Sequence, residues 1–190
     1  GQAIRLTGDD AVSLPKGVGD FNRHQAFSLS LWIKPTLFHD RAVVVRRSKA
    51  WTDAASRGYE LLLQNNRPSF ALIHFWPGNA LRVRNTHAIP LNEWTHLAVS
   101  YDGSSKASGV GFYRNGWKTK SEVIRNNLTR EIKGGGDPFV ALGQRMRDRG
   151  FKNGLIDEFQ LFDRELSAFE VSMLAGTDLE SSDEFEISST

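Results

Sequence analysis

The segment over residues 154–170 constrains the fold more than any other part of this chain. Residues 154–162, GLIDEFQLF, alternate apolar and polar side chains as a half-buried β-strand does. Shortly after, Ser167 stands three positions before Glu170, the spacing of a capping box, in which each side chain satisfies a free backbone N–H of the other residue. The sequence therefore predicts a strand that leads into a short capped helix over residues 168–174.

The rest of the chain repeats the two-residue period and has no long helical periodicity. Three sets of apolar residues are each expected to share one face of a strand: Phe27, Leu29, Leu31 and Ile33; Tyr59, Leu61 and Leu63; and Leu97, Val99 and Tyr101. Asn115-Gly116 predicts a type I′ hairpin, and residues 69–76 are apolar on both faces, as in a central strand. Many short strands and one terminal helix indicate a sandwich of two antiparallel sheets.

Four blocks carry a family resemblance: FSLSLWIKP from residue 27, EWTHLAVSYDG from residue 93, FYRNG from residue 112 and GLIDEFQLFDREL from residue 154. In this order they resemble the laminin-G-like domains of the concanavalin A-like lectin/glucanase superfamily, over about residues 2–175. The resemblance implies an all-β, concanavalin A-like jelly-roll sandwich of two antiparallel sheets with one short C-terminal helix. The wording between the blocks is similar to versions embedded in large bacterial multidomain proteins with cytochrome-c-type modules. That likeness implies an extracytoplasmic location, whether periplasmic, cell-surface or secreted.

Length and charge divide the chain into a body and a tail. The 190 residues suit one domain over residues 1–176, which is large enough to bury a core although the chain has no cysteine. Residues 177–190 hold five acids, no base and several serines, which predicts a solvated tail or linker. Because the whole chain carries +2, the body carries +7, a balance that favours acidic polysaccharides or other anions.

The chain shows no targeting or membrane segment. No apolar run approaches the roughly 20 residues that cross a bilayer, so no membrane span is expected. No signal peptide is visible either, and the chain opens on a strand-like segment over residues 2–6, as an excised domain would.

The carboxylates lack the pattern of a glycoside hydrolase. Glucanases of this superfamily carry closely spaced acids such as E-x-D-x-E on one strand, since hydrolysis needs two carboxyl groups about 5–9 Å apart. Asp157 and Glu158 are adjacent and are expected on opposite faces of a strand, whereas Glu60 and Glu122 are solitary. The histidines lack metal-ligand spacing, and no G-x-S-x-G elbow occurs. We therefore expect no enzymatic activity.

Asp157 is expected on the buried face of its strand, in phase with Leu155, Phe159 and Leu161. A buried carboxylate costs several kcal/mol unless a cation or several donors compensate for it. Two interpretations stay open. Asp157 accepts backbone N–H bonds or pairs with an arginine, or, as the resemblance implies, it holds a structural Ca²⁺ together with Asp9 and Asp10 of the N-terminal Gly-Asp turn.

Sugar recognition needs an aromatic ring that packs against the C–H face of the sugar, and planar polar groups that form hydrogen bonds with its hydroxyls. Three segments offer this mixture, and their candidate ligand-binding residues are Trp76, His74, Asn79, Arg82 and Arg84 around one turn, Trp51 in a loop with Arg46, Arg47 and Arg57, and Arg145 and Arg147 in a third loop. Each has a plainer interpretation, because strand aromatics are commonly core and arginine clusters are commonly solvated. Trp32 is a further candidate, whereas Trp94 is expected in the core because the family's matching tryptophan packs inside.

These features together predict a non-catalytic carbohydrate-binding module of a larger extracytoplasmic protein. Its expected partner is a carbohydrate, acidic polysaccharides included, or another protein module. The alternative is a protein-interaction or spacer domain without a sugar site, and a glucanase-like hydrolase is a third possibility. A sugar binder should expose Trp51 or Trp76 beside polar groups, whereas a spacer should bury every tryptophan. Nucleic acid is not expected, since Asp148 interrupts the basic run over residues 145–149 and no nucleic-acid motif is present.

Overall fold

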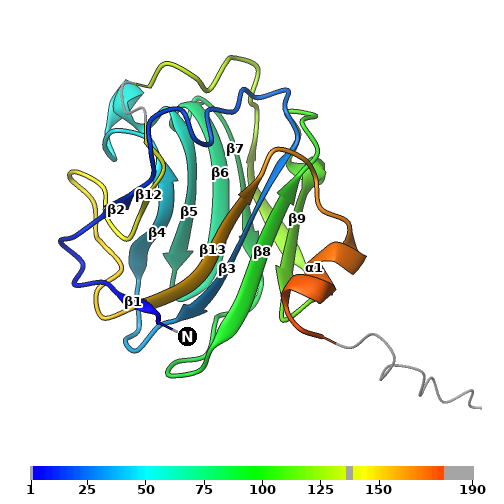
Figure 1. Cartoon of the computed structure of the whole chain (residues 1–190). Helices are drawn as coiled ribbons and strands as arrows, with labels where there is room; N and C mark the ends of the chain where they lie inside the picture. The colour runs from blue at the N-terminus through cyan, green and yellow to red at the C-terminus, as the bar shows by residue number, and fades with distance from the viewer. Residues whose placement is uncertain (1, 136–138, 178–190) are drawn as a thin grey trace, which may run out of the picture.

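The computed structural model describes residues 2–135 and 139–177, and within them the chain forms two antiparallel sheets stacked face to face (Figure 1). The smaller sheet consists of β1 (Ile4–Arg5), β13 (Leu155–Phe162), β3 (Phe27–Lys34), β8 (Thr95–Tyr101), β9 (Val110–Arg114) and β10 (Trp117–Lys118), in that order. The larger sheet consists of β11 (Ser121–Asn126), β7 (Asn79–Asn85), β6 (Arg67–Phe75), β5 (Gly58–Gln64), β4 (Arg41–Arg47), β12 (Ala141–Leu142) and β2 (Val12–Ser13). This arrangement confirms the predicted all-β sandwich. From residue 178 on, the predicted tail lies outside the described residues.

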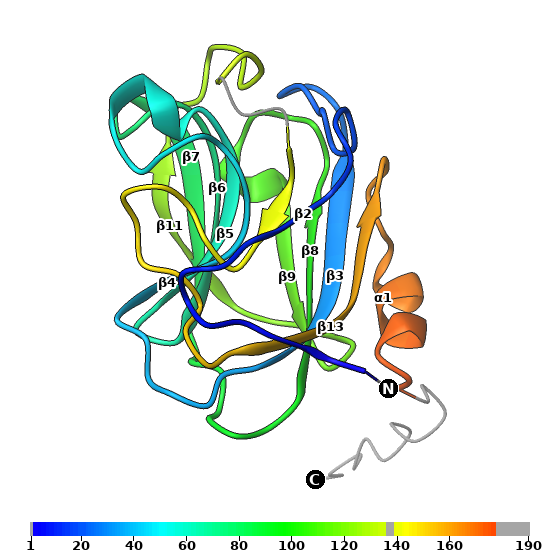
Figure 2. The ribbon, with the colours of Figure 1, turned by 60° about the vertical axis from the view of Figure 1, so that its left-hand side comes forward.

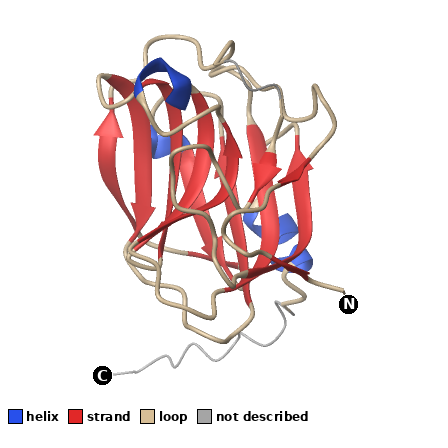
Figure 3. Cartoon of the chain, turned by 90° about the vertical axis from the view of Figure 1, so that its left-hand side faces the viewer, coloured by secondary structure: helices blue, strands red, loops and turns tan. Residues whose placement is uncertain are grey.

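Helical segments are short and lie at the ends or outside of the sheets (Figure 3). They are η1 (Asp53–Ser56), η2 (Ala107–Gly109) and α1 (Ala168–Leu174). Within the residues that the structure describes, none of these helices has the length and apolar character needed to cross a bilayer.

The core lies between the two sheets and is built from the alternating residues that the sequence singled out. Phe27, Leu29, Leu31 and Ile33 of β3 are all buried in it, as are the predicted sets of β5 and β8. The aromatic ring of Phe27 contacts the rings of Tyr59 and Tyr101 from opposite sheets, with centroids 5.0 and 5.6 Å apart. Strand β6 pairs with β5 and β7 and is central, as predicted. In the turn between β9 and β10, Asn115 and Gly116 both have positive φ (49° and 86°), as a type I′ hairpin requires.

Helix α1 lies outside the smaller sheet (Figure 2). Ser167 is its N-cap, and the reciprocal bonds with Glu170 that define a capping box are both present, as predicted. Ser28, on the outer face of β3, binds the segment that leads into this helix. Ser28 Oγ accepts the backbone N–H of Leu166 at 2.9 Å and donates to the carbonyl of Arg164 at 2.9 Å. Leu166 and Val171 are buried against Tyr113 of β9, which fixes α1 on the sheet.

Two expectations about side-chain direction are wrong. Asp157 does not lie on the core face, because β13 contains a bulge: its pairing with β3 shifts between Asp157 and Gln160, and Glu158 has a positive φ of 48°. A bulge reverses which residues face the core. Ile156 is therefore in the core before the bulge, and Phe159 and Leu161 pack against the core after it.

Trp94 is not a core residue either, since its side chain is 39% exposed. It precedes β8, in which odd-numbered residues such as Leu97 and Val99 face the core. An even-numbered residue next to this strand is out of phase with them.

Candidate functional site

The outer face of the larger sheet, formed by side chains of β4 to β7 that point away from the core, carries a row of charged residues. Arg46 of β4, Glu60 of β5, Ala71 of β6 and Arg82 of β7 are direct partners across adjacent strands. In β5, β6 and β7 the residues on both sides of this row face the core, and in β4 Val45 does, so alternation aims these four outward. The methyl group of Ala71 leaves room for Arg82 to cross β6 and ion-pair with Glu60.

A loop from the other end of the chain completes this row. Backbone hydrogen bonds join the loop over residues 143–150 to β4 and the turn after it. The N–H of Gly143 donates to the carbonyl of Val44 (2.9 Å), that of Val43 to the carbonyl of Arg149 (2.9 Å) and that of Trp51 to the carbonyl of Met146 (3.3 Å). These bonds bring Arg145 and Asp148 over the outer face.

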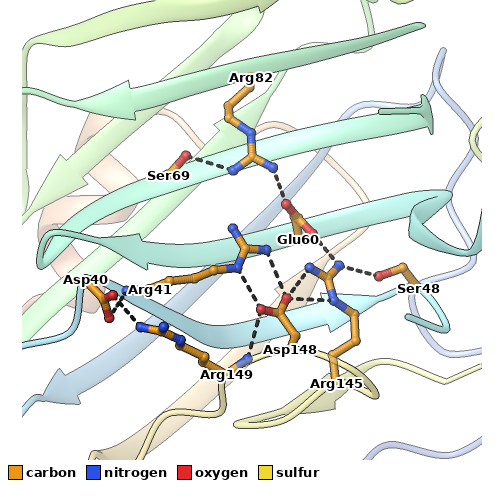
Figure 4. Close-up of polar contacts among 9 residues, drawn as sticks. All are labelled: Asp40, Arg41, Ser48, Glu60, Ser69, Arg82, Arg145, Asp148 and Arg149. Atoms are coloured by element: carbon orange, nitrogen blue, oxygen red, sulfur yellow. Dashed lines mark hydrogen bonds and ion pairs between the residues drawn. The ribbon is translucent and has the colours of Figure 1, made fainter. Parts of the chain in front are cut away.

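Five side chains form what we call the Glu60 cluster: Glu60, Arg82, Arg145, Asp148 and Arg41 (Figure 4). Glu60 accepts from Arg82 with one carboxylate oxygen and from Arg145 with the other. Arg145 also donates from Nη2 to Asp148 Oδ2 at 2.6 Å and from Nη1 to Ser48 Oγ at 2.8 Å. Asp148 accepts a bidentate pair from Arg41, at 2.6 and 2.9 Å.

The cluster is an extended buried ion network. The side chains of Glu60, Arg82, Arg145 and Asp148 are at most 1% exposed, and that of Arg41 is 17% exposed. Burial raises the pKa of Glu60, but the charges of Arg145 and Arg82 outweigh it, so the pKa lies below its ordinary value. Burial likewise raises the pKa of Asp148, and hydrogen bonds from Arg41 and Arg145 reverse that effect. Both acids are therefore ionised at neutral pH.

Two tryptophans lie on this cluster. The ring centroid of Trp51 lies 3.7 Å from the guanidinium carbon of Arg41 and 5.6 Å from the guanidinium carbon of Arg145. The guanidinium carbon of Arg82 lies 4.4 Å from the ring centroid of Trp76, which also packs against the outer-face residues Ala71, Ile73 and Ala80. Both indoles are partly exposed. Cation–π contact thus orients two aromatic plates on one face of the sheet.

The structure therefore brings together four of the candidate ligand residues, Trp51, Trp76, Arg82 and Arg145. Arg84 also points outward from β7, but it pairs with Glu122, which Arg67 shares. Arg147 is exposed, at a position of positive φ (60°), with no interaction recorded for its side chain among the described residues.

His74 and Asn79 lie beside Trp76 in a different feature, which we call the Arg57 cleft. It has a volume of about 460 Å³ and is lined by Arg57, His74, Phe75, Gly78, Asn79, Thr129 and Arg130. Asn79 uses its amide to hold one wall: Oδ1 accepts the backbone N–H groups of Thr129 and Arg130, each at 3.1 Å, and Nδ2 donates to Thr129 Oγ1 at 2.7 Å.

The three carboxylates expected to bind Ca²⁺ do not converge. Leu6 donates to the carbonyl of Gly154, and β1 runs antiparallel to β13, so the chain beyond Leu6 approaches Lys152 while Asp157 lies in the opposite direction. Asp10 accepts from Thr7 Oγ1 at 2.6 Å, and Asp157 accepts the backbone N–H of Glu158 at 2.9 Å. Over residues 2–135 and 139–177, no group of three or more His, Asp and Glu side chains could hold a metal ion. These residues do not fit the calcium site that the resemblance implies.

The sequence interpretation missed the centre of the cluster. In the sequence Glu60 is a solitary acid, and Asp148 only interrupts a basic run. One signal was available, since Glu60 stands between Tyr59 and Leu61 in a strand whose other residues are almost all apolar. A charge in such a strand needs a buried partner. The identity of that partner depends on strand register and on a loop 85 residues away along the chain.

The comparisons with known proteins agree with this fold. Residues 6–172 match the Laminin_G_3 model, described as the concanavalin A-like lectin/glucanases superfamily. No curated protein matches the sequence. The binding domain of Paraclostridial Mosquitocidal Protein 1 aligns with a TM-score of 0.67 and 22% identity over 91% of this chain and 42% of that one. The binding domain of botulinum neurotoxin serotype G aligns with a TM-score of 0.60 and 17% identity, over 92% and 46%.

The chain thus spans less than half the length of these two toxin domains, and at this identity they share only the fold. A nearer match in sequence is domain 4 of AbnA, a GH43 extracellular arabinanase from Geobacillus stearothermophilus, solved in complex with arabinotriose. It aligns with a TM-score of 0.58 and 26% identity over 91% of this chain and 76% of that one. The matched family model covers most of the chain, and the chain therefore belongs to the concanavalin A-like lectin/glucanase superfamily, as a Laminin_G_3 domain.

Proposed function

We propose that this domain is a non-catalytic carbohydrate-binding module of a larger extracytoplasmic protein, and that the sugar binds on the outer face of the larger sheet. The observation that carries the proposal is the placement of Trp51 and Trp76 on one buried ion cluster, each partly exposed. A pyranose or furanose ring presents C–H groups to an indole face, and its hydroxyls bond to planar polar groups at the edge. Arg41, which is partly exposed next to Trp51, is such a group.

The cluster beneath the tryptophans supports this role by making the face rigid. Each indole packs on a guanidinium that is itself held by a carboxylate, Trp76 on Arg82 and Trp51 on Arg41. A side chain that is already fixed loses little conformational entropy when a ligand binds, and this preorganisation favours affinity. The arabinotriose complex of the AbnA domain is a further support for a sugar ligand.

The carboxylates of the cluster favour binding over hydrolysis. Glu60 and Asp148 both contact Arg145, so two acids do lie near one point of the outer face. A glycosidase needs one acid that keeps its proton near neutral pH and another that reaches the sugar. Here the pKa of each acid is lowered, and neither side chain is more than 1% exposed. These properties support a structural role for both acids.

The alternative, a protein-interaction module, would use another surface. Helix α1 exposes Phe169 and Met173, which are 61% and 64% exposed, beside a cleft of about 300 Å³ that Phe162 and Leu174 also line. Exposed apolar residues that lie together are common at protein interfaces.

Affinity electrophoresis through gels that contain neutral or acidic polysaccharides tests the proposal, with Trp51→Ala and Trp76→Ala as variants. We expect the native domain to be retarded by at least one polysaccharide and each variant to lose most of this retardation. Trp117→Ala is the matched control, since Trp117 is 48% exposed in the other sheet, at the β9–β10 hairpin. Trp76→Phe should retain part of the binding because it keeps an aromatic plate.

Melting curves of the same variants separate a lost ligand contact from a lost fold. Trp76→Ala should remain folded at the temperature of the assay, because the core between the sheets is intact. Retardation of both alanine variants like the native domain would place the ligand elsewhere. No retardation in any polysaccharide would contradict the sugar-binding role and favour the protein-interaction module.

A further inference from the structure

The Arg57 cleft adjoins the proposed sugar site. Phe75 and Gly78, which flank the Trp76-Pro77 pair along the chain, both line it, so the cleft lies beside the segment that carries Trp76. Its volume of about 460 Å³ is sufficient for a monosaccharide unit. A chain bound across Trp76 would therefore reach this cleft with its next residue.

The charge of the cleft is positive and unpaired. Among the side chains that the structure describes, Arg57 and Arg130 line the cleft and no acid does, and neither arginine forms an ion pair with any of them. Most other arginines on this sheet and its loops do form an ion pair with an Asp or a Glu. They are Arg41, Arg47, Arg67, Arg82, Arg84, Arg145 and Arg149. The nearest acid along the chain, Glu131, points its Oε1 at the backbone N–H groups of Arg23, Ile132 and Lys133.

The side chain of Arg57 and the backbone of Arg130 are held by neighbouring residues. Arg57 Nε donates to the carbonyl of His74 at 3.3 Å, and its Nη2 lies 3.5 Å from His74 Nε2. His74 in turn donates from Nδ1 to the carbonyl of Glu131 at 2.7 Å, which leaves Nε2 as the acceptor that faces Arg57. On the opposite wall, Asn79 fixes the backbone of Arg130. His74 and Asn79 thus act as positioning residues rather than as direct ligands.

We propose that the Arg57 cleft binds the carboxylate or sulfate group of an acidic polysaccharide, next to a sugar ring that lies on Trp76. This inference rests on the proposed function and names its ligand class. A guanidinium with free N–H groups matches a carboxylate or sulfate in geometry and charge. Two unpaired guanidinium groups at one cleft would stay solvated and repel each other unless an anion joined them. The charge of +7 on residues 1–176 attracts such a ligand from a distance.

Two matched pairs of probes test the inference: polygalacturonate against its methyl ester, and dextran sulfate against dextran. Within each pair the sugar rings are the same and only the charge differs. By isothermal titration calorimetry, we expect an acidic probe to bind about tenfold or more tightly than its neutral counterpart, the effect of one charge-assisted hydrogen-bonded pair. The pair that shows the difference tells whether the cleft prefers a carboxylate or a sulfate.

Arg57→Gln and Arg130→Gln, alone and together, should reduce the affinity for the acidic probe to that for the neutral one and leave the neutral probe unaffected. Arg5→Gln removes the same charge from an exposed site on β1 in the other sheet and should change neither. Arg130 is exposed, and its backbone N–H is unchanged by the substitution, so this variant folds even if Arg57→Gln does not.

The outcomes separate this inference from the proposed function. If both members of each pair bind equally through Trp76, or if the cleft variants behave like Arg5→Gln, the inference is wrong and the sugar-binding role stands. If neither acidic nor neutral probes bind, both are wrong.

Discussion

Arg82 of β7 reaches across Ala71 of β6 to form a buried ion pair with Glu60 of β5. Direct contact between side chains two strands apart is possible here because the residue between them is small. Trp76 covers the crossing guanidinium from outside. The pair therefore joins the outer faces of β5 and β7 across β6, and it supports the indole on which we propose that a sugar ring packs.

Ala71→Leu should break this relationship. Ala71 is fully buried, and the longer side chain would occupy the path of Arg82. Overpacking costs about 1–3 kcal/mol, and the displaced ion pair adds to it, so we expect the free energy of unfolding to fall by about 3 kcal/mol or more in urea denaturation. Ala71→Ser, which adds a single oxygen, is the control and should cost less than half as much. A leucine variant as stable as the serine variant would show that Arg82 does not need this gap.

Arg145→Met should be among the most destabilising substitutions in the domain. It leaves Glu60 and Asp148 buried with one arginine fewer each, a change that costs about 3–5 kcal/mol. The cost should be greatest at pH 7 and should shrink below about pH 5, because protonated acids do not need the missing charge. Urea denaturation at several pH values measures it. Arg164→Met is the matched control, since its pair with Glu170 is exposed to solvent and such pairs contribute little to stability.

The native domain should itself lose stability in acid through the same two carboxylates. In the folded state the pKa of Glu60 and that of Asp148 are lowered, so the unfolded chain binds protons first as the pH falls. Their stabilisation is therefore complete above ordinary carboxyl pKa values, and it decreases as the pH falls from about 4.5 toward the folded-state values. Glu60→Gln should show a shallower decrease than the native domain in this range. Equal slopes would mean that Glu60 does not titrate with unfolding.

A separate decrease should appear at higher pH because of His96. Burial lowers its pKa from 6.5 to about 4; its Nε2 contacts Ser30 Oγ at 2.8 Å, and its ring meets that of Trp32 edge to face, with centroids 5.4 Å apart. Since the unfolded chain protonates His96 near pH 6.5, stability is lost as the pH falls from there toward 4, by about 2 kcal/mol between pH 6.5 and 5. His96→Gln should remove this part of the pH dependence, which denaturation at pH 7, 6 and 5 would detect. A slope that persists in the variant would belong to His39, because burial lowers its pKa as well.

The sequence predicted the fold well because the fold depends on local patterns. The two-residue period of β3, β5 and β8, the Asn115-Gly116 turn and the Ser167 cap are each encoded within a few neighbouring residues, and each is confirmed. The site was predicted only in part. The sequence points to Trp51, Trp76, Arg82 and Arg145 as candidates, but it does not point to Glu60, which joins the two arginines. The contacts among these residues depend on strand register and on a distant loop.

The bulge in β13 shows a second limit of pattern analysis. One extra residue, Glu158, reverses the phase of the strand, so simple alternation placed Asp157 on the wrong face. The sequence GLIDEFQLF is consistent with either phase, since Ile156 and Leu155 are equally apolar. Only the pairing with β3 decides between them.

Substitution of Asp157 tests whether this carboxylate stabilises the bulge of β13 or binds calcium. Its carboxylate accepts the backbone N–H of Glu158 at 2.9 Å, so we expect it to stabilise the bulge rather than a metal ion. Asp157→Ala should lower the free energy of unfolding by about 1 kcal/mol, the usual contribution of one hydrogen bond, equally in Ca²⁺ and in EDTA. Because Asp9, Asp10 and Asp157 do not converge, the native domain should also melt at the same temperature in both buffers. A native midpoint several degrees higher in Ca²⁺, lost in Asp157→Ala, would instead mean that the ion binds the folded state through this carboxylate.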